Sequence, residues 1–396
     1  MAQANNTYRE TTTTSWFSRI RQALTGIFVG LILVAASLVL LFWNEGRAIK
    51  TYRALTEGAG SIVSVDAAKV DPANEGKLIH IAGAFAPKST PADAELGVAA
   101  EGAVRLLRTV EMYQWKETSR SETKTKLGGG EETVTTYEYG KEWSSEPIES
   151  AKFKVPDGHA NPAMPIRSND FAIASGDLGA FNLTGEQIGG LGDRKALALA
   201  DADAVRIKDR VAPTRSARID QGRVFIGYNL DQPWIGDLRI SYETASLPQV
   251  SAAGAQKGNG LADYVTSNGQ TIFLTQAGIV SAAQMFADAQ TGNTIVTWVL
   301  RAVGLVLLLI GFTLILRIFG VLGDVVPFFG DVVRFGTGLV AFLLTALLGS
   351  LAIALGWFFY RPLWGLAILA VGVLVAGVLW YRGKARAKAI PAPAAS

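Results

Sequence analysis

The chain has 396 residues, a formal net charge of +3 and no cysteine, and 49% of its residues are hydrophobic. The absence of cysteine excludes disulfide bonds, thiolate metal sites and thiol nucleophiles. Basic residues gather near the two termini, so the central part is mildly acidic and offers no electrostatic basis for binding nucleic acid.

Four hydrophobic segments set the expected architecture. One lies near the N-terminus and three lie in the last quarter, and each is close to the roughly 20 residues that a helix needs to cross a bilayer. Roughly 250 residues of mixed polarity separate the first segment from the others, which is enough for one ordinary core. The predicted order is a basic N-terminal arm (1–24), a first transmembrane helix (25–43), a large domain (44–293), a second transmembrane helix (294–319), an amphipathic interfacial segment (320–336), a third (337–360) and a fourth (363–381) transmembrane helix, and a basic tail (382–396).

Flanking charges predict the orientation. Four spans place both termini on one side, and the tail carries four basic residues between Arg382 and Lys388. By the positive-inside rule we expect both termini in the cytoplasm and the large domain outside it, which for a bacterial inner membrane is the periplasm. The first segment ends at Trp43 without a small-x-small cleavage site, so we expect it to remain as an anchor.

Two details of the spans carry expectations about packing. Gly26 and Gly30 in the first span are spaced to allow another helix to approach closely. Arg301 lies just inside the start of the second span, where arginine usually extends its head toward the lipid headgroups. The two glycines permit a contact face, although chance spacing in a glycine-rich span is the favoured reading, and we expect a solvated charge at Arg301.

The central domain reads mainly as β-strands. Val104–Glu117 and Thr133–Trp143 are rich in β-formers, and the polar run between them contains three glycines from Gly128, which predicts a long hairpin. Further strands are predicted at 77–82, 151–155, 204–208, 223–228, 237–244 and 270–275, and helices at 52–68, 184–191 and 277–285. The expected fold class is an α+β extracytoplasmic domain with a mostly antiparallel sheet, plus a four-helix transmembrane module of one and then three spans.

The segment between the second and third spans is the most patterned. Its sequence contains GDVV twice, and Arg317, Asp324 and Asp331 recur every seven residues, while Pro327 and the glycines interrupt a continuous helix. We expect an interfacial turn with its charges facing water. A docking or re-entrant element and an ion-handling role for the two aspartates are the alternatives. The candidate membrane-surface residues are Arg317, Asp324, Pro327, Asp331 and Arg334.

Catalytic signatures are missing from the sequence. There is no GxSxG, HExxH, P-loop or GxGxxG after a strand. His80 lies in an apolar strand and His159 in a loop, so both are expected to be structural. Asp201 and Asp203 have a spacing that suits a divalent cation, but solvated loop acids fit better. No catalytic residue, cofactor site or metal site is therefore predicted.

Four short motifs resemble those of a known family. They are Asn44–Ala48 (NEGRA), Val110–Lys116 (VEMYQWK), His159–Pro162 (HANP) and Gly323–Gly330 (GDVVPFFG). Together with the order of one span, a domain and three spans, they resemble the transmembrane protein 43 family, also called LUMA, in a prokaryotic version. The candidate family motif is Asn44, Glu45, Gly46 and Arg47.

The resemblance implies a multipass protein whose large domain faces the lumen in eukaryotes. Eukaryotic relatives are described as self-associating organisers of the endoplasmic reticulum and inner nuclear envelope, with lamina and emerin-type partners. The resemblance brings no catalytic residue, and the nuclear partners cannot apply to a bacterial chain. It therefore implies fold and topology more strongly than a molecular activity.

The leading hypothesis is a non-enzymatic membrane scaffold that assembles with copies of itself. The expected partners are the lipid bilayer and further copies of the chain, with other membrane proteins as additional candidates. The hairpin edges would pair between subunits, and the candidate contacts are Tyr113, Trp115, Tyr137 and Trp143. The alternatives are an oligomeric channel or transporter, and a lipid-modifying or hydrolytic enzyme that faces the periplasm.

Overall fold

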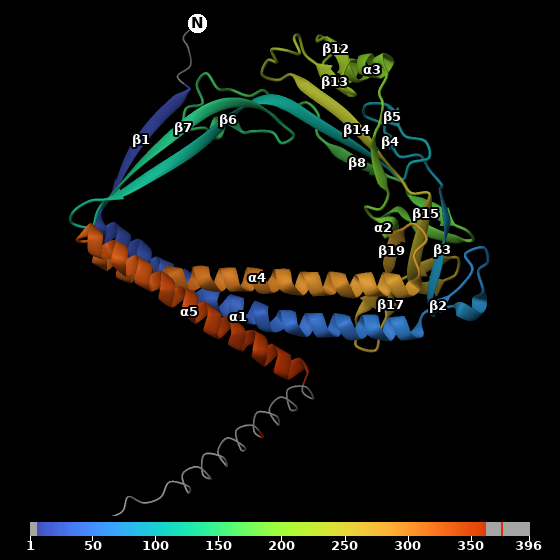
Figure 1. The fold of residues 1–396 in the computed structure, drawn as a ribbon. Helices are drawn as coiled ribbons and strands as arrows, with labels where there is room; N and C mark the ends of the chain where they lie inside the picture. The colour runs from blue at the N-terminus through green and yellow to red at the C-terminus, as the bar shows by residue number, and fades with distance from the viewer. Residues whose placement is uncertain (1–5, 362–373, 375–396) are drawn as a thin grey trace, which may run out of the picture. The chain divides into compact units, whose positions relative to one another are not determined.

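The computed structural model describes residues 6–361 and residue 374 (Figure 1). The chain folds into two compact units. The first, which we call the sheet unit, contains the residues up to Thr13, Ala54–Lys124 and Glu132–Gln290. The second, the helix unit, contains Thr14–Arg53, Thr125–Glu131 and the residues from Thr291 on. The predicted fourth span (363–381) and the basic tail (382–396) lie outside the described residues, apart from residue 374.

Three long helices contain the apolar segments of the described chain. They are α1 (Trp16–Ser61), α4 (Ala282–Gly323) and α5 (Pro327–Tyr360), and each is long and apolar enough to cross a membrane. Large apolar side chains remain exposed along all three, so this surface contacts the lipid bilayer. At about 1.5 Å per residue the 46 residues of α1 extend for about 69 Å, roughly twice the hydrocarbon thickness of a bilayer.

Small residues bring α1 and α4 together. A Cβ built on Gly30 would lie 2.7 Å from the Gly311 carbonyl oxygen, and one on Gly311 would lie 3.0 Å from that of Gly30. The contact face that the spacing of Gly26 and Gly30 permits is therefore present, and α4 is the partner helix. Around it Leu41, Leu308 and neighbouring apolar residues of the three helices form the core of the helix unit.

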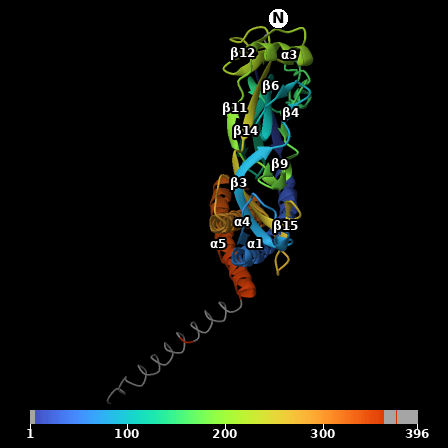
Figure 2. The same cartoon turned by 90° about the vertical axis from the view of Figure 1, so that its right-hand side faces the viewer.

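Two sheets and two strand pairs make up most of the sheet unit (Figures 1 and 2). The first sheet has the order β1 (Thr7–Thr14), β7 (Glu131–Ser144), β6 (Arg105–Thr125), β14 (Leu238–Ser246), β13 (Arg223–Ile226) and β12 (Ala217–Asp220), with β8 (Asn169–Ala172) beside β6 and β11 (Asp193–Ala196) beside β14. The second has the order β19 (Leu274–Ala277), β15 (Gln249–Lys257), β16 (Gly260–Ala262), β10 (Phe181–Thr184), β9 (Ser175–Leu178), β3 (Leu78–Pro87) and β2 (Val63–Ser64). The strand pairs are β4 (Ala92–Asp93) with β5 (Val98–Ala99), and β17 (Tyr264–Val265) with β18 (Thr271–Ile272). The short helices are α2 (Gly185–Ile188), α3 (Asp201–Val211), η1 (Pro72–Asn74) and η2 (Ser150–Lys152).

The predicted antiparallel α+β class is confirmed. The long hairpin is present as β6 and β7, and the helix predicted at 184–191 is present as α2, which Thr184 caps through a capping box with Gln187. Two apolar clusters form the core, one around Phe181 and Ile81 and the other around Tyr242. Each is built from the alternating inward residues of the strands.

The sequence predicted an N-terminal arm that is separate from the domain, and the structure shows part of that arm in the sheet unit. Residues 7–14 form β1, which lies beside β7 in the first sheet (Figure 1). The backbone N–H of Tyr139 donates to the carbonyl of Asn6 at 2.9 Å, and Lys154 Nζ lies 2.7 Å from Glu10 Oε1. The threonine-rich sequence TYRETTTT suits an edge strand, because β-branched side chains favour the extended backbone.

Three predicted elements of the domain are wrong. The strand predicted at 204–208 is part of α3, because Ala204 and Ile207 are buried at helical spacing and Asp203 accepts from the backbone N–H of Ala200. The strand predicted at 151–155 overlaps the 3₁₀ turn η2 instead. The helix predicted at 52–68 ends at Ser61, the last residue of α1.

Candidate functional site

Both histidines are buried and contact backbone carbonyls. His80 is buried on β3, where Nε2 lies 2.9 Å from the Val280 carbonyl and Nδ1 lies 3.3 Å from the Ser64 hydroxyl. His159 is buried with Nδ1 3.0 Å from the Val155 carbonyl, and its ring stacks on that of Tyr139 at a centroid distance of 4.0 Å. Both imidazoles therefore hold backbone segments together.

Acidic groups in the sheet unit are also used structurally. Asp203 accepts from the Ala200 backbone N–H and pairs with Arg206, so the DADA pair lies at the start of α3 and not in a loop. Among the described residues no group of three or more His, Cys, Asp and Glu side chains is placed to hold a metal ion.

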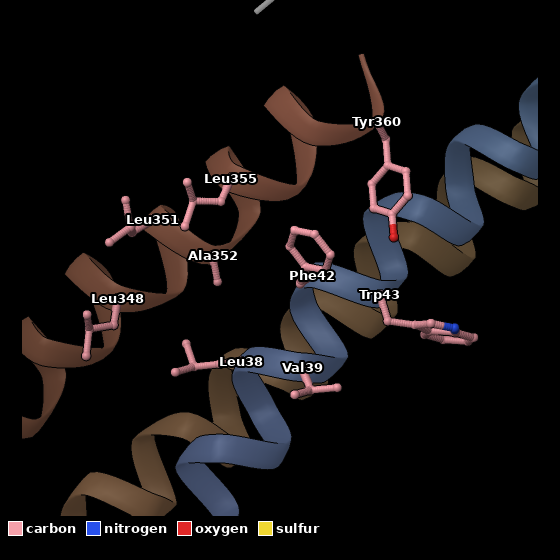
Figure 3. Close-up of a pocket in the computed structure, with 9 residues that line it drawn as sticks. All are labelled: Leu38, Val39, Phe42, Trp43, Leu348, Leu351, Ala352, Leu355 and Tyr360. Carbon is pink, nitrogen blue, oxygen red and sulfur yellow. The ribbon is translucent and has the colours of Figure 1, made fainter. Parts of the chain in front are cut away.

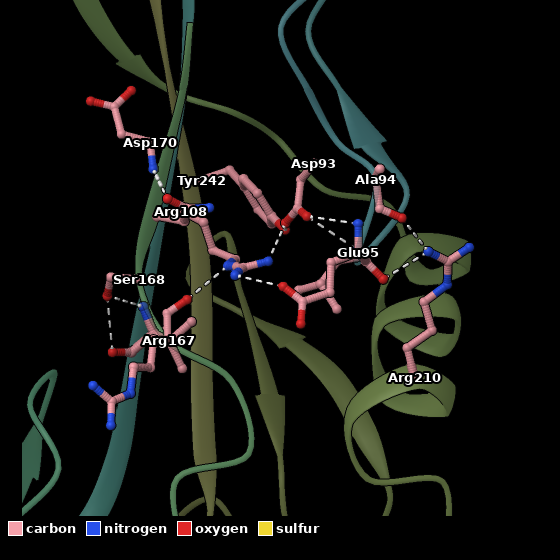
Figure 4. A network of polar contacts seen from close by, with 12 residues as sticks. Asp93, Ala94, Glu95, Arg108, Arg167, Ser168, Asp170, Arg210 and Tyr242 are labelled. Carbon is pink, nitrogen blue, oxygen red and sulfur yellow. Dashed lines mark hydrogen bonds and ion pairs between the residues drawn. The ribbon is translucent and has the colours of Figure 1, made fainter.

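A buried charge network lies beneath the first sheet (Figure 4). Asp93 Oδ2 accepts from Arg108 at 2.6 Å and from the Tyr242 hydroxyl at 2.5 Å, and all three side chains are buried. Arg108 also donates to Glu95 and to the Arg167 carbonyl. Burial raises the pKa of Tyr242, so its phenol remains a hydrogen-bond donor at a pH where a free tyrosine would ionise. Each charge is satisfied by neighbours, so the network fixes β4 against β6 and β14.

The residues of the HANP motif have structural contacts with β6. Asn161 Oδ1 accepts from the Trp115 N–H at 2.7 Å, and Asn161 Nδ2 donates to the Trp115 carbonyl at 2.9 Å. The Trp115 ring packs edge-on against His159 at a centroid distance of 4.7 Å. This loop therefore acts like an additional strand beside β6, which accounts for both the VEMYQWK and the HANP motifs.

The four aromatic residues predicted as subunit contacts are partly exposed and have contacts within the chain. Tyr113 and Trp143 pack together at a centroid distance of 5.2 Å, and Arg239 lies 4.0 Å from the centroid of the Trp143 ring. Lys141 Nζ lies 4.6 Å from the centroid of the Trp115 ring, and Tyr137 donates to Glu10 at 3.4 Å. These aromatic residues already stabilise the sheet unit.

Alkaline titration is expected to destabilise the sheet unit through Tyr139. Burial, followed by the hydrogen bond to Glu117, raises the pKa of Tyr139 from 10.0 to about 12. The folded state retains a proton that the unfolded chain loses across this interval, so the free energy of unfolding falls as pH rises from about 10 to about 12. In Tyr139→Phe that fall should be shallower than in the wild type.

The measurement is the free energy of unfolding of the full chain in detergent as a function of pH. The Phe variant also loses hydrogen bonds to Glu117 and Val155, so slopes and not absolute stabilities are compared. Tyr228→Phe, at an exposed position, is the control. Equal slopes in Tyr139→Phe and the wild type would contradict the assignment.

The NEGR motif lies on α1, where it binds α4. Asn44 donates to the Thr297 carbonyl at 3.0 Å, and Arg47 donates to the side chains of Asn293 and Thr297. The buried Glu45 accepts from two nitrogens of Arg301, at 2.7 and 2.8 Å, in a bidentate pair whose arginine is partly exposed. The guanidinium of Arg301 is thus held by a paired carboxylate, and its predicted extension toward the headgroups stays a prediction.

Gly46, the remaining residue of the NEGR motif, leaves space for a side chain of α5. A Cβ at this position would overlap the Tyr360 ring at the end of α5. All four motif residues thus bring α1 together with α4 or α5.

The second cluster lies at the turn between α4 and α5. Asp324 is fully buried and accepts from Arg19 of α1 at 2.5 Å and from Arg334 of α5 at 2.5 and 2.6 Å. Arg19 is itself only 3% exposed and also pairs with Glu131, while Arg334 pairs with Asp331. We call these five residues the arginine–aspartate cluster.

The tip of the β6–β7 hairpin contacts the arginine–aspartate cluster. The Gly129 carbonyl accepts from Arg19 at 2.5 Å, and the Gly128 N–H donates to the Val325 carbonyl at 3.1 Å. Gly129 has φ = +80°, and a Cβ there would overlap the Trp16 ring, so both its conformation and its close contact require glycine. The tip is thereby attached to both helix ends.

The predicted interfacial segment is mostly helical. Helix α4 continues to Gly323 and Pro327 begins α5, so only residues 324–326 form the turn. The expectation that its charges face water is wrong for Asp324. Arg317 and Asp331 are exposed, and Arg317 lies outside the arginine–aspartate cluster.

An apolar groove runs between α1 and α5 (Figure 3). It has a volume of about 440 Å³ and is lined by leucines of both helices, with Phe42, Trp43 and Tyr360 at one end. Such a lining suits hydrocarbon and provides few groups that could orient a polar substrate.

Comparison with known proteins gives one consistent family. The family described as Transmembrane protein 43 matches residues 112–362. The chain is 36% identical to Transmembrane protein 43 of Mus musculus over 366 residues, which cover 89% of each chain. It is 34% identical to the Homo sapiens protein over 386 residues, 94% of this chain and 93% of the relative. The Transmembrane protein 43 homolog of Drosophila melanogaster is 27% identical over 285 residues. No solved structure gives a significant match.

Proposed function

Because the chain belongs to the transmembrane protein 43 family, we propose that it is a non-enzymatic membrane scaffold that assembles with copies of itself. The family membership and the apolar helices support contact with the lipid bilayer. The family name specifies no reaction, and the polar side chains described above serve structural contacts. A scaffold needs a membrane-bound part that is rigidly joined to a polar surface.

The observation that carries this proposal is the arginine–aspartate cluster. A carboxylate with no exposed surface accepts from one arginine of α1 and one of α5, and the same α1 arginine binds the hairpin tip. Burying these charges is costly unless each is paired, so the arrangement holds one geometry. The membrane helices and the polar hairpin tip are therefore firmly coupled within the helix unit.

We further propose that self-assembly uses the hairpin surface and β1. Strand β7 has β1 as its neighbour, and β14 pairs with β6 over Arg105–Met112, so the chain itself covers the edge of β7 and the first part of the edge of β6. Among the strands that the structure describes, β1 forms the edge of the sheet on the hairpin's side. The candidate contacts Tyr113, Trp115, Tyr137 and Trp143 remain partly exposed on the hairpin, where a second copy would bury them further.

The proposed location is a bacterial inner membrane, with the sheet unit in the periplasm and the basic tail in the cytoplasm. The basic residues after the last apolar segment support this orientation by the positive-inside rule. The exposed Arg317 and Asp331 remain candidates for contact with headgroups or with other membrane proteins. A channel is less favoured, because Glu45 and Arg301 neutralise each other in a bidentate pair.

The test is the mass of the detergent-solubilised particle, measured by light scattering with native lipids retained. A defined oligomer supports the scaffold, whereas a persistent monomer contradicts it. Ion flux through reconstituted liposomes would favour the channel instead.

The contact surface is tested with a proline in β1. Since the Asn6 carbonyl faces β7, the alternation of a strand directs the backbone N–H of Thr11 to the open edge. Thr11→Pro removes that donor and should reduce the particle mass, while Thr11→Val should leave it unchanged. An unchanged mass in the proline variant would exclude pairing through this edge.

A further inference from the structure

The apolar groove between α1 and α5 is closed at one end by an aromatic side chain (Figure 3). A Cβ on Gly46 of α1 would overlap the Tyr360 ring, so this ring reaches from α5 across to α1. Phe42 packs against it at a centroid distance of 5.5 Å. The rest of the lining is mainly leucine, so the groove is an apolar slot with one aromatic end.

The length and volume of the groove suit one acyl chain. Leu348 and Tyr360, which both line it, are 12 positions apart on α5, or about 18 Å at about 1.5 Å per residue. The hydrocarbon core of a bilayer is about 30 Å thick, so each of its two layers of acyl chains is about 15 Å deep. The volume of about 440 Å³ lies within the range of roughly 300–1,000 Å³ that is typical of ligand sites.

Two arginines lie at the aromatic end of the groove. Arg53 of α1 donates to the Tyr360 carbonyl at 3.2 Å. Arg361 follows Tyr360 directly, and its guanidinium carbon lies 4.5 Å from the centroid of the Trp357 ring. Within the described part of the chain neither arginine has a carboxylate partner. Both positive charges are therefore available to a ligand of the helix unit.

Neighbouring acids do not offset these charges. Residues 348–361 contain no carboxylate, and Glu45 is the sole acid in residues 39–53. Glu45 already pairs with Arg301 at 2.7 Å, and Lys50 adds a further positive charge to this part of α1. An excess of positive charge beside an apolar groove is complementary to a molecule with an anionic head and an apolar tail.

We propose that this groove binds one anionic phospholipid of the bilayer, with an acyl chain between α1 and α5 and the phosphate at Arg53 and Arg361. Tryptophan and tyrosine are enriched at the level of the headgroups, and Trp43, Trp357 and Tyr360 gather at this end. Guanidinium groups bind phosphate through paired N–H donors, and Arg53 has donors beyond the one that binds the Tyr360 carbonyl. A zwitterionic lipid gains less, because its own ammonium group offsets the charge of its phosphate.

The charge requirement is tested by native mass spectrometry of the full chain, delipidated in detergent and titrated with phosphatidylglycerol or with phosphatidylcholine of the same acyl chains. We expect one saturable site that prefers phosphatidylglycerol. The double variant Arg53→Gln/Arg361→Gln should bind that lipid roughly 30-fold more weakly, which is roughly 5-fold for each arginine. Its affinity for phosphatidylcholine should change little. Arg317→Gln, at an exposed arginine of α4, is the control and should leave both affinities unchanged.

The groove is tested separately with Leu351→Trp, which enlarges a side chain of the lining. Overpacking the groove should weaken the binding of both lipids roughly 10-fold. Leu343→Trp, at a similarly exposed position of α5 outside the lining, should leave both unchanged. Val39→Trp enlarges the lining from α1 and replaces Leu351→Trp if that variant does not fold.

Equal affinities of the wild type for the two lipids, or unchanged binding in the tryptophan variant, would overturn the inference. The absence of saturable binding would also overturn it, and is the result expected if residues 363–381, which lie outside the described residues, covered the groove. The inference does not depend on self-assembly. A monomer that binds the lipid would reject the scaffold alone, and an oligomer without the lipid site would reject this inference alone.

Discussion

Asp324→Asn is expected to destabilise the helix unit by about 3 kcal/mol, because it removes the buried charge that Arg19 and Arg334 share while Arg19 keeps one other ionic partner. The carboxylate is fully buried, and it is the shared acceptor for Arg19 and Arg334. An asparagine of nearly the same size keeps the packing but removes the charge. Arg19, which is 3% exposed, would then retain only Glu131 as an ionic partner.

The matched control is Asp331→Asn. Asp331 lies seven residues later in the repeated GDVV sequence, but its side chain is 75% exposed and accepts only from Arg334. An exposed ion pair of this kind contributes about 0.5 kcal/mol. Thermal unfolding of the two variants in detergent should therefore show a large decrease in Tm for Asp324→Asn and a small one for Asp331→Asn. Similar decreases would show that the cluster does not stabilise the helix unit.

The two aspartates illustrate where sequence reasoning ends. Their spacing of seven residues suggested that both lie on one face of a helix and share one role, yet one is buried and the other is exposed. The difference comes from Arg19, which is 305 residues away in the chain and has no local signal in the sequence. An arginine shortly before an apolar segment normally reads as a topology determinant, so its pairing with a distant carboxylate was not predictable.

Features with a local physical cause were predicted well. The length of the apolar segments predicted the three long helices, and β-formers around a glycine-rich run predicted the β6–β7 hairpin. The short helix predicted at 184–191 also has a local cause, because Thr184 caps α2. Each depends on residues within a few positions of one another.

Features that depend on long-range pairing were missed. The strand β1 joins residues 7–14 to residues more than a hundred positions later, and Glu45 pairs with an arginine 256 residues away. The NEGR motif was recognised as a resemblance, but its role in binding α4 required the structure. The motifs in this chain therefore correspond to contacts between helices and loops more than to catalytic or binding groups.

Gly330→Ala is expected to cost about 3 kcal/mol, at the upper end of what overpacking a well-packed site costs. Gly330 lies in α5, and a Cβ at this position would overlap the Asp324 carboxylate and lie 3.0 Å from its Cα. The carboxylate can move only by losing its hydrogen bonds to Arg19 and Arg334. Gly336→Ala in the same helix meets no atom within 4 Å and should stabilise the helix by about 0.5 kcal/mol, because alanine is the better helix former.

The double variant separates this mechanism from a general intolerance of α5. If the cost of Gly330→Ala arises from the carboxylate, it should be smaller in an Asp324→Ala background, where that carboxylate is absent. Side chains in contact show such non-additive effects, whereas independent sites add. The measurement is the unfolding of the four proteins of this cycle in one detergent, with Gly336→Ala as reference. Strict additivity of Gly330→Ala and Asp324→Ala would show that the glycine is required for some reason other than space for the buried aspartate.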